Sequence, residues 1–127
     1  MLMSVKSIAW NGYPAKDGAR LLKFYRDVVG LRVDRAYPSE EEAQLVEFDV
    51  GNGHWFSLLP ENMTGTVAGR AGGVVFEVDD IDAMLERVRP HAKRTDEKPA
   101  DYPNCRVASF QDPEGNHIGL HQHKTTA

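Results

Sequence analysis

The chain lacks the features that mark several large classes of protein. Cys105 is the only cysteine among its 127 residues, so no disulfide can form within the chain and nothing indicates an oxidising compartment. It has no apolar run long enough to span a membrane, and its start, MLMSVKSIAWNG, does not resemble a secretory signal. These absences predict a cytoplasmic protein without a membrane partner.

Basic clusters are absent as well. The formal net charge is -4, and lysines and arginines do not gather into runs. Both facts argue against a nucleic acid as partner. The composition, with 41% hydrophobic and 27% charged residues, is typical of one soluble domain that is large enough to bury its own core. A small molecule is the kind of partner that these observations leave open.

The two halves of the sequence repeat each other. Moved by 62 positions, DVGNGHWFSL (49–58) falls on QDPEGNHIGL (111–120), which aligns Gly53 with Gly115. Moved by 63 positions, Asp17 falls on Asp80. An internal repeat constrains the architecture before any other feature does. We therefore expect one domain built from two similar modules.

Each half predicts a strand, then a helix, then two or three further strands. Asp17 and Asp80 are suitable helix N-caps, Gly30 is suited to end the first helix, and Pro90 ends the second. Asn52-Gly53 indicates a tight hairpin between two strands. The expected strands are VKSIAWNGY (5–13), AQLVEFDV (43–50), HWFSLL (54–59), GGVVFEVD (72–79), CRVASF (105–110) and NHIGLHQH (116–123).

The expected domain covers residues 1–127. Module one spans about 4–60, module two spans about 73–123, and a glycine- and threonine-rich linker lies between them at about 61–72. Within the strands, apolar and polar residues alternate, which places them on opposite faces. The apolar face is expected to lie under the helix of its module. The opposite face, which carries Glu47 in one half and Glu77 in the other, is expected to line a cavity.

Three segments carry a resemblance to a known family: KFYRDVVGLRV (23–33), VVFEVDDIDAML (74–85) and FQDPEGNHIGL (110–120). The chain resembles the vicinal oxygen chelate superfamily, which contains glyoxalases, bleomycin resistance proteins and extradiol dioxygenases. The resemblance implies an α+β fold in which two βαβββ modules form an open eight-stranded cup with the helices outside. It also implies that a ligand binds inside the cup and that the chain forms a homodimer.

The resemblance further implies where a divalent metal would bind. In metal-dependent members, ligands come from the first and last strands of each module, and these positions fall on Trp10, Ser57, Gly73 and Gly119. An indole nitrogen has no free lone pair, glycine has no side chain, and a neutral hydroxyl is a weak ligand. We therefore predict no cofactor. The alternative is a divalent metal such as zinc, iron, nickel or manganese, held by other residues.

The histidines of the last strand are the candidates for that alternative. His121 and His123 lie two residues apart on one strand face, about 6.6 to 6.8 Å from each other, and could share an ion with a third ligand. A solvated C-terminal tail is the simpler explanation for them. His117 is too far from His121 to join the same site. It remains a candidate for acid–base work, because histidine titrates near neutral pH.

The candidate ligand-binding residues are Trp10, Trp55, Ser57, Glu47, Glu77, His117 and His121. The tryptophans could stack on a flat ligand. Glu77, if enclosed by apolar side chains, would have a raised pKa and could act as a base. Glu77 could instead lie at the rim of the cup, exposed or paired with Arg106.

Two classes of function follow. The first is a binding protein that lacks the usual metal ligands and takes an aromatic or cationic compound into its cup. The alternative is an enzyme, namely a lyase, isomerase or dioxygenase of the glyoxalase type. Its chemistry would depend either on a metal or on acid–base work by Glu77 or His117. The fold by itself does not decide between binding and catalysis.

Overall fold

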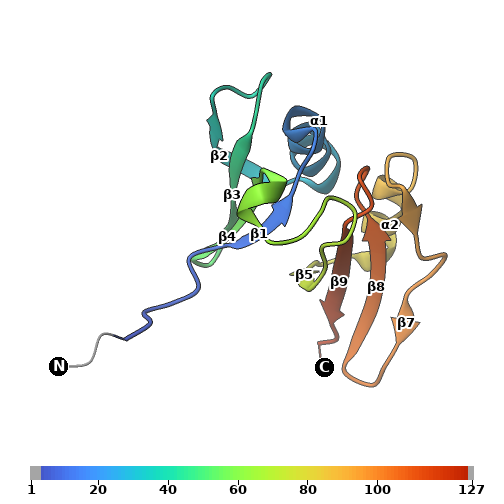
Figure 1. Cartoon of the computed structure of the whole chain (residues 1–127). Coiled ribbons are helices and arrows are strands. Elements are labelled where there is room, and N and C mark those ends of the chain that lie inside the picture. Colours follow the sequence, from blue (N-terminus) through green and yellow to red (C-terminus); the bar gives the residue numbers. More distant parts are fainter. Residues whose placement is uncertain (1–3, 126–127) are drawn as a thin grey trace.

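The computed structural model describes residues 4–125 and consists of two sheets with helices packed against them (Figure 1). The first sheet has the order β1-β4-β3-β2, with bounds Asn11–Pro14, His54–Leu59, Leu45–Gly51 and Arg32–Tyr37. The second has the order β5-β9-β8-β6, with bounds Val74–Glu77, His117–His123, Cys105–Gln111 and Arg94–Thr95. A further short strand, β7 (Ala100–Asp101), also pairs with β8.

Both sheets use the same strand pairing, which confirms the repeat. The first strand of each module runs parallel to the last, so β1 pairs with β4 and β5 pairs with β9. The other pairs are antiparallel. In the hairpin between β3 and β4, Asn52 and Gly53 both have positive φ angles, of 56° and 77°, as the sequence predicts.

The helices begin and end where the sequence indicates. α1 (Gly18–Lys23) continues into the wider helical segment η1 (Phe24–Val29), and α2 spans Ile81–Val88. An oxygen of each N-cap aspartate accepts a backbone N–H bond, from Arg20 and Ala83 respectively. Gly30 ends η1 in the left-handed conformation, with a φ of 97°. A single-turn helix, η2 (Glu61–Met63), follows β4.

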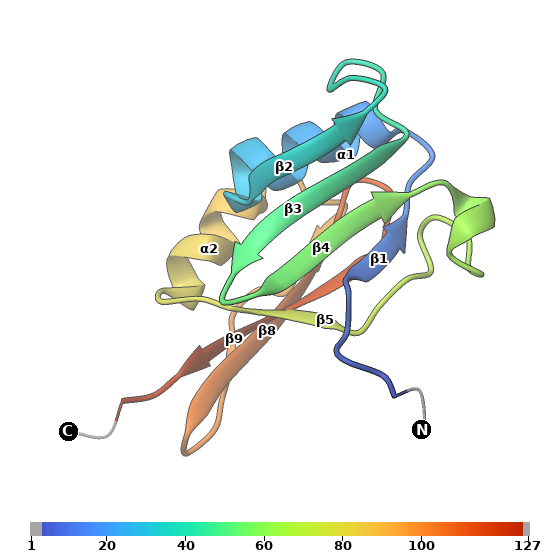
Figure 2. The ribbon, with the colours of Figure 1, turned by 90° about the vertical axis from the view of Figure 1, so that its left-hand side faces the viewer.

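The helices and the apolar faces of both sheets share one core. Phe24 on η1 packs against Phe110 on β8, with ring centroids 6.0 Å apart, and Phe56 on β4 meets Phe76 on β5 at 5.6 Å. On β3 the alternation of buried and partly exposed residues confirms the predicted apolar face, with Val46 and Phe48 fully buried. The other face of the first sheet carries no helix and is turned toward the viewer in Figure 2. We call it the open face.

The DPEGN turn before β9 connects the two modules. Asp112 is fully buried and accepts a hydrogen bond of 2.7 Å from the hydroxyl of Tyr25 on η1. Glu114 accepts the backbone N–H groups of Lys16 and Asp17 at 2.8 and 2.7 Å. Buried Asn116 receives N–H bonds from the linker and donates to the Pro14 carbonyl. This segment of the family resemblance thus links the two modules through hydrogen bonds.

The two open sheets, one from each module, confirm the expected α+β fold of two βαβββ modules. Two features differ from the sequence expectations. The strand expected over 5–13 is limited to Asn11–Pro14, because Asn11 already pairs with Phe56 and β4 begins only two residues earlier. The residues before β1 therefore have almost no strand to pair with, and residues 4–8 run away from the body of the molecule (Figure 1). In addition, the segments that form β2, β6 and β7 are strands that the sequence reading did not assign. No helix within residues 4–125 is long and apolar enough to cross a bilayer.

Candidate functional site

A cavity of about 310 Å³ lies on the open face of the first sheet. We call it the tryptophan cavity. It is lined by Ala9, Trp10, Asp34, Glu47, Trp55 and Ser57. Its volume is at the lower end of the range for sites that bind small organic molecules. Four of the predicted ligand-binding residues therefore come together here: Trp10, Trp55, Ser57 and Glu47.

Strand register explains why these side chains meet. Glu47 on β3 lies directly opposite Ser57 on β4, and paired residues of neighbouring strands point to the same face. Trp55 lies two residues before Ser57 and therefore shares that face. Phe56, between them, points into the core. The alternating pattern of β3 and β4 thus builds the floor and one wall of the cavity.

Asp34 reaches the cavity through an irregularity in β2. The register with β3 shifts by one residue between Val33 and Arg35, so Asp34 is an extra residue on the bulged strand. Bulges redirect side chains and are common near functional sites. Sequence reasoning missed Asp34, because it assigned no strand to 32–37 and because alternation alone does not reveal a bulge. The only signal for a strand in this segment was the mixture of polar and apolar residues in RVDRAY (32–37).

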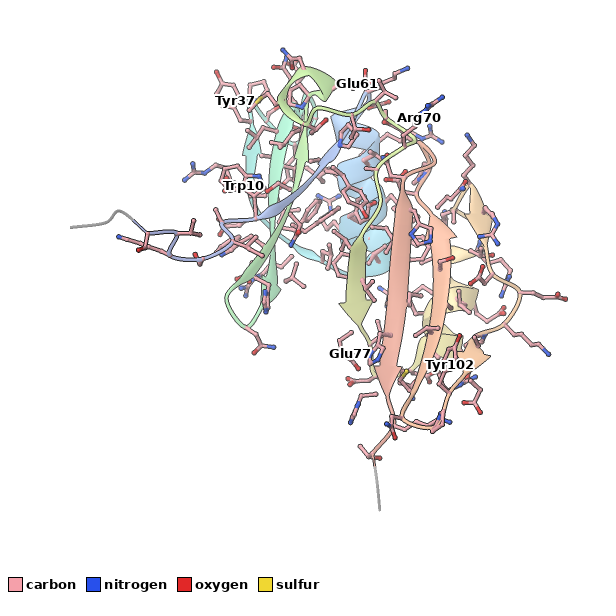
Figure 3. All side chains as sticks on the ribbon, turned by 60° about the horizontal axis from the view of Figure 1, so that its bottom comes forward. Trp10, Tyr37, Glu61, Arg70, Glu77 and Tyr102 are labelled. Carbon is pink, nitrogen blue, oxygen red and sulfur yellow. The ribbon has the colours of Figure 1, made fainter. Side chains whose placement is uncertain are left out.

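Trp10 lies just before β1 and forms another wall of the cavity. Figure 3 shows it beside the first sheet, away from Glu77 at the end of β5. Glycine at position 12 permits this placement, since a Cβ there would lie 3.4 Å from the indole and 2.8 Å from Leu59 Cδ1. Trp10 is 48% exposed, and neither it nor Trp55 packs against another aromatic ring within residues 4–125. Ring surface of both indoles is open to a ligand.

Ser57 is the most unusual residue of the cavity. Its side chain is 1% exposed, yet its hydroxyl has no hydrogen-bond partner within residues 4–125. Leaving a buried hydroxyl unpaired costs about 1 to 3 kcal/mol, and native proteins rarely do so without a reason. Because Ser57 is among the residues that line the cavity, its unpaired hydroxyl is a candidate to bond a ligand there.

The cavity is also acidic. Two other arginines of this module are paired elsewhere, Arg26 with Asp27 and Glu40, and Arg32 with Asp49. Across residues 4–125, neither Asp34 nor Glu47 takes part in any ion pair. Arg35 lies opposite Glu47 in the strand register and therefore shares its face of the sheet, but it forms no ion pair with Glu47 and is not among the residues that line the cavity. Two carboxylates therefore line the cavity without an ion-paired basic side chain from residues 4–125.

A second cavity, of about 380 Å³, lies between the β3–β4 hairpin and β5. We call it the crevice. His54, Trp55, Val75 and Glu77 are among its lining residues. Trp55 therefore borders both cavities. Glu77 shares the crevice with Trp55 and Val75, whereas Trp10 lines only the tryptophan cavity.

Glu77 is not enclosed by apolar side chains, which was the condition for a raised pKa; its side chain is 59% exposed, as in the alternative of a carboxylate at the rim. A hydrogen bond from the backbone N–H of His123 and a 2.5 Å contact with His121 Nδ1 lower the pKa of this carboxyl below its ordinary value. The carboxylate is thus held in its charged form by groups of β9, and it is poorly suited to act as a base. It does not pair with Arg106, whose guanidinium bonds Asp82 at 2.6 Å.

The histidine candidates lie outside both cavities. His117 is exposed at the start of β9, where its backbone N–H donates to the Ala71 carbonyl at 2.8 Å. The ring of His121 is engaged with Glu77. The structure therefore separates His117 and His121 from the tryptophans, and their roles in ligand binding stay predictions.

The positions that hold a metal in related proteins do not fit one here. Trp10 and Ser57 offer no strong ligand, and Gly73 and Gly119 offer no side chain. The space above Gly119 is covered by Val75, since a Cβ on this glycine would lie 2.9 Å from Val75 Cγ2. Within residues 4–125, no three His, Cys, Asp or Glu side chains gather in an arrangement able to hold an ion.

The pairing of two βαβββ modules with an open sheet face defines a glyoxalase-like protein. Residues 7–120 match the model of the Glyoxalase/Bleomycin resistance protein/Dioxygenase superfamily, and the chain belongs to that family. No curated protein matches the chain significantly.

Solved structures agree with this fold. TnmS3, an antibiotic-binding protein from Streptomyces sp. CB03234, is 24% identical with a TM-score of 0.75, covering 97% of this chain and 100% of that one. A glyoxalase/bleomycin resistance protein from the same organism is 26% identical, with a TM-score of 0.73 and coverages of 91% and 100%. A lactoylglutathione lyase from Agrobacterium tumefaciens is 22% identical, with a TM-score of 0.70 and coverages of 94% and 95%.

Proposed function

We propose that this protein binds a small aromatic or cationic compound in the tryptophan cavity and does so without a metal. The observation that carries the proposal is that Ser57 lines this cavity and that its buried hydroxyl has no partner within residues 4–125. The open indole surfaces of Trp10 and Trp55 supply the apolar contact area that such sites use.

The comparisons support binding as the function. One similar structure is described as an antibiotic-binding protein. The lactoylglutathione lyase shows that catalysis also occurs on this fold. In this chain, however, the positions expected for metal ligands carry Trp10, Ser57, Gly73 and Gly119, and the charged Glu77 is not tuned as a base. Binding of a ligand requires neither metal ligands nor a carboxylate tuned as a base.

We also propose that the protein acts as a homodimer. Val5 and Ile8, in the segment that runs away from the body, are 92% and 77% exposed, and Val75 on the second sheet is 59% exposed. Exposed apolar groups of this kind favour association with another surface. A second copy would cover them. Size-exclusion chromatography with light scattering tests this, and Val5→Ser with Ile8→Ser should shift a dimer toward the monomer.

The binding function can be tested on protein purified without a histidine tag. Tryptophan fluorescence should change when a library of flat aromatic compounds is added, because Trp10 and Trp55 are the only tryptophans in the chain. Silence across the library would contradict the proposal. Elemental analysis of the same sample should find less than stoichiometric zinc, iron, nickel or manganese. A stoichiometric metal would instead favour the glyoxalase-type enzyme.

A further inference from the structure

We infer that the tryptophan cavity selects a flat organic cation that carries an N–H group, read by Glu47, Asp34 and Ser57. This inference rests on the proposed binding function and adds the charge and hydrogen-bonding character of the ligand. It assigns Ser57 as the acceptor of the ligand N–H and the two carboxylates as the groups that recognise its positive charge. The tryptophans hold the ring system.

The charge of the cavity is the first argument. Asp34 and Glu47 are the only ionisable residues among the lining residues, and both are acidic. Two carboxylates around one small cavity, neither of them in an ion pair within residues 4–125, repel an anion and attract a cation. Exposure of Asp34 to solvent reduces its share, whereas Glu47 is half-buried.

The bulge in β2 is the second argument. In a regular ladder, the residue after Val33 would pair with a residue of β3. Asp34 is instead an extra residue without a partner on β3, and it lines the cavity. The carboxylate of Asp34 is therefore the second one at the cavity. The first is that of Glu47, which the register of β3 and β4 places beside Ser57. Arg35 lies opposite Glu47 but forms no ion pair with either carboxylate, so a cation that enters the cavity reduces the repulsion between the two like charges.

Ser57 supplies the independent observation. Its buried hydroxyl can both donate and accept, and no group within residues 4–125 uses it. It lies opposite Glu47, so one N–H group could reach both the hydroxyl and the carboxylate. Hydrogen bonds that involve an ionised partner are stronger than neutral ones. A cation with N–H donors therefore satisfies Ser57 and Glu47 together.

The aromatic walls complete the argument. A cation near the face of a tryptophan is attracted by the ring quadrupole, most strongly where water is excluded. Trp55 is partly buried and Trp10 is about half exposed, so a flat ring can stack on Trp10 and contact Trp55. Apolar contact and charge thus act on the same ligand.

Three dyes of similar shape separate the contributions. Acridine is neutral near neutral pH, N-methylacridinium is a cation without N–H donors, and proflavine is a cation with N–H donors. Calorimetric titration should show the affinity rising in that order. We expect proflavine to bind about tenfold more tightly than acridine, since a charged hydrogen bond in a partly buried site is worth about that factor.

Variants assign the effect to residues. Glu47→Gln should weaken proflavine and N-methylacridinium several-fold and leave acridine unchanged. Ser57→Ala should weaken proflavine alone. Glu41→Gln is the matched control, because it removes the same charge from an exposed loop residue of module one outside the cavity. Asp34→Asn should act as Glu47→Gln does, but more weakly.

Two results would overturn this inference and leave the proposed function standing. One is acridine binding as tightly as the two cations. The other is Glu41→Gln weakening the cations as much as Glu47→Gln, which would mean that only the overall charge matters. If none of the three dyes binds, the inference also fails, and the tryptophan fluorescence screen then decides whether the binding function fails with it.

Discussion

The two sheets of this protein have the same pairing and connectivity, yet they differ in how their polar side chains are hydrogen-bonded. In module one, Glu47 and Ser57 lie side by side without a partner from residues 4–125. In module two, Glu77 bonds His121 and the backbone of His123, and Ser109 bonds Asp96. One face leaves polar atoms available for a ligand and the other satisfies them internally.

The repeat makes this comparison position by position. Moved by 62 residues, Ser57 falls on Gly119, Trp55 on His117 and Glu47 on Ser109. At Gly119, Val75 covers the space that a side chain would take. The two halves thus share one scaffold, and different residues at equivalent positions line a cavity in module one and form closed polar contacts in module two. Fold similarity does not imply that both modules bind a ligand.

The largest expected effect is at the tryptophan that borders both cavities. Trp55→Ala should weaken whichever acridine dye binds best by about 30-fold, because removing a central aromatic side chain commonly costs about 2 kcal/mol or more of binding energy. His117→Ala, at the equivalent position of module two, should leave the affinity unchanged. Calorimetric titration measures both variants, and far-UV circular dichroism checks that each remains folded.

Equal losses in the two variants would break the comparison, since they would place the ligand on module two as well. An unchanged affinity for Trp55→Ala would place the ligand outside the tryptophan cavity altogether.

The two serines should respond with opposite signs. Ser57→Ala removes a buried hydroxyl that has no partner, so we expect the free energy of unfolding of the ligand-free protein to rise by about 1 kcal/mol. Ser109→Ala removes a hydroxyl that bonds Asp96 at 3.3 Å, so we expect a decrease of about 0.5 to 1 kcal/mol. Urea denaturation of both variants measures the difference.

A loss of stability in Ser57→Ala would mean that the hydroxyl already has a partner in solution, such as an ordered water. Its candidacy as a ligand contact would then be weaker. If Ser57→Ala increases the free energy of unfolding and also weakens proflavine binding, the Ser57 hydroxyl contributes to binding at the expense of stability.

The sequence predicts the scaffold well because its signals are local. The helix-capping aspartates, Gly30 and the Asn52-Gly53 hairpin each require only neighbouring residues, and the structure confirms all of them. The predicted strand over 5–13 was too long, because pairing depends on where the distant β4 begins.

The site was predictable only in part for the same reason. Alternation placed Glu47, Trp55 and Ser57 on the open face, but the bulge that brings Asp34 there depends on the register between two strands. The sequence left the environment of Glu77 open because its partners, His121 and His123, lie 44 and 46 positions away in the sequence. Spacing in one strand does not reveal what the neighbouring strand offers.

The smallest expected effect concerns the paired carboxylate of module two. Because the pKa of Glu77 is lowered in the folded protein from its ordinary value of 4.5, its contacts stabilise the fold above that pH. This contribution should be lost as the pH falls through the lowered pKa. The side chain is 59% exposed, so we expect less than about 1 kcal/mol. The measurement is the difference in free energy of unfolding between the wild type and Glu77→Gln across the acidic range.

A second variant apportions this effect between the two partners. The backbone N–H of His123 is the larger cause of the lowered pKa and His121 the smaller. In a His121→Ala background, the stability difference caused by Glu77→Gln should therefore shrink without disappearing. A difference that does not vary with pH in either background would mean that β9 does not hold the Glu77 carboxylate in solution. The polar groups of module two would then be as available as those of module one, and the contrast between the open faces would rest on the tryptophans alone.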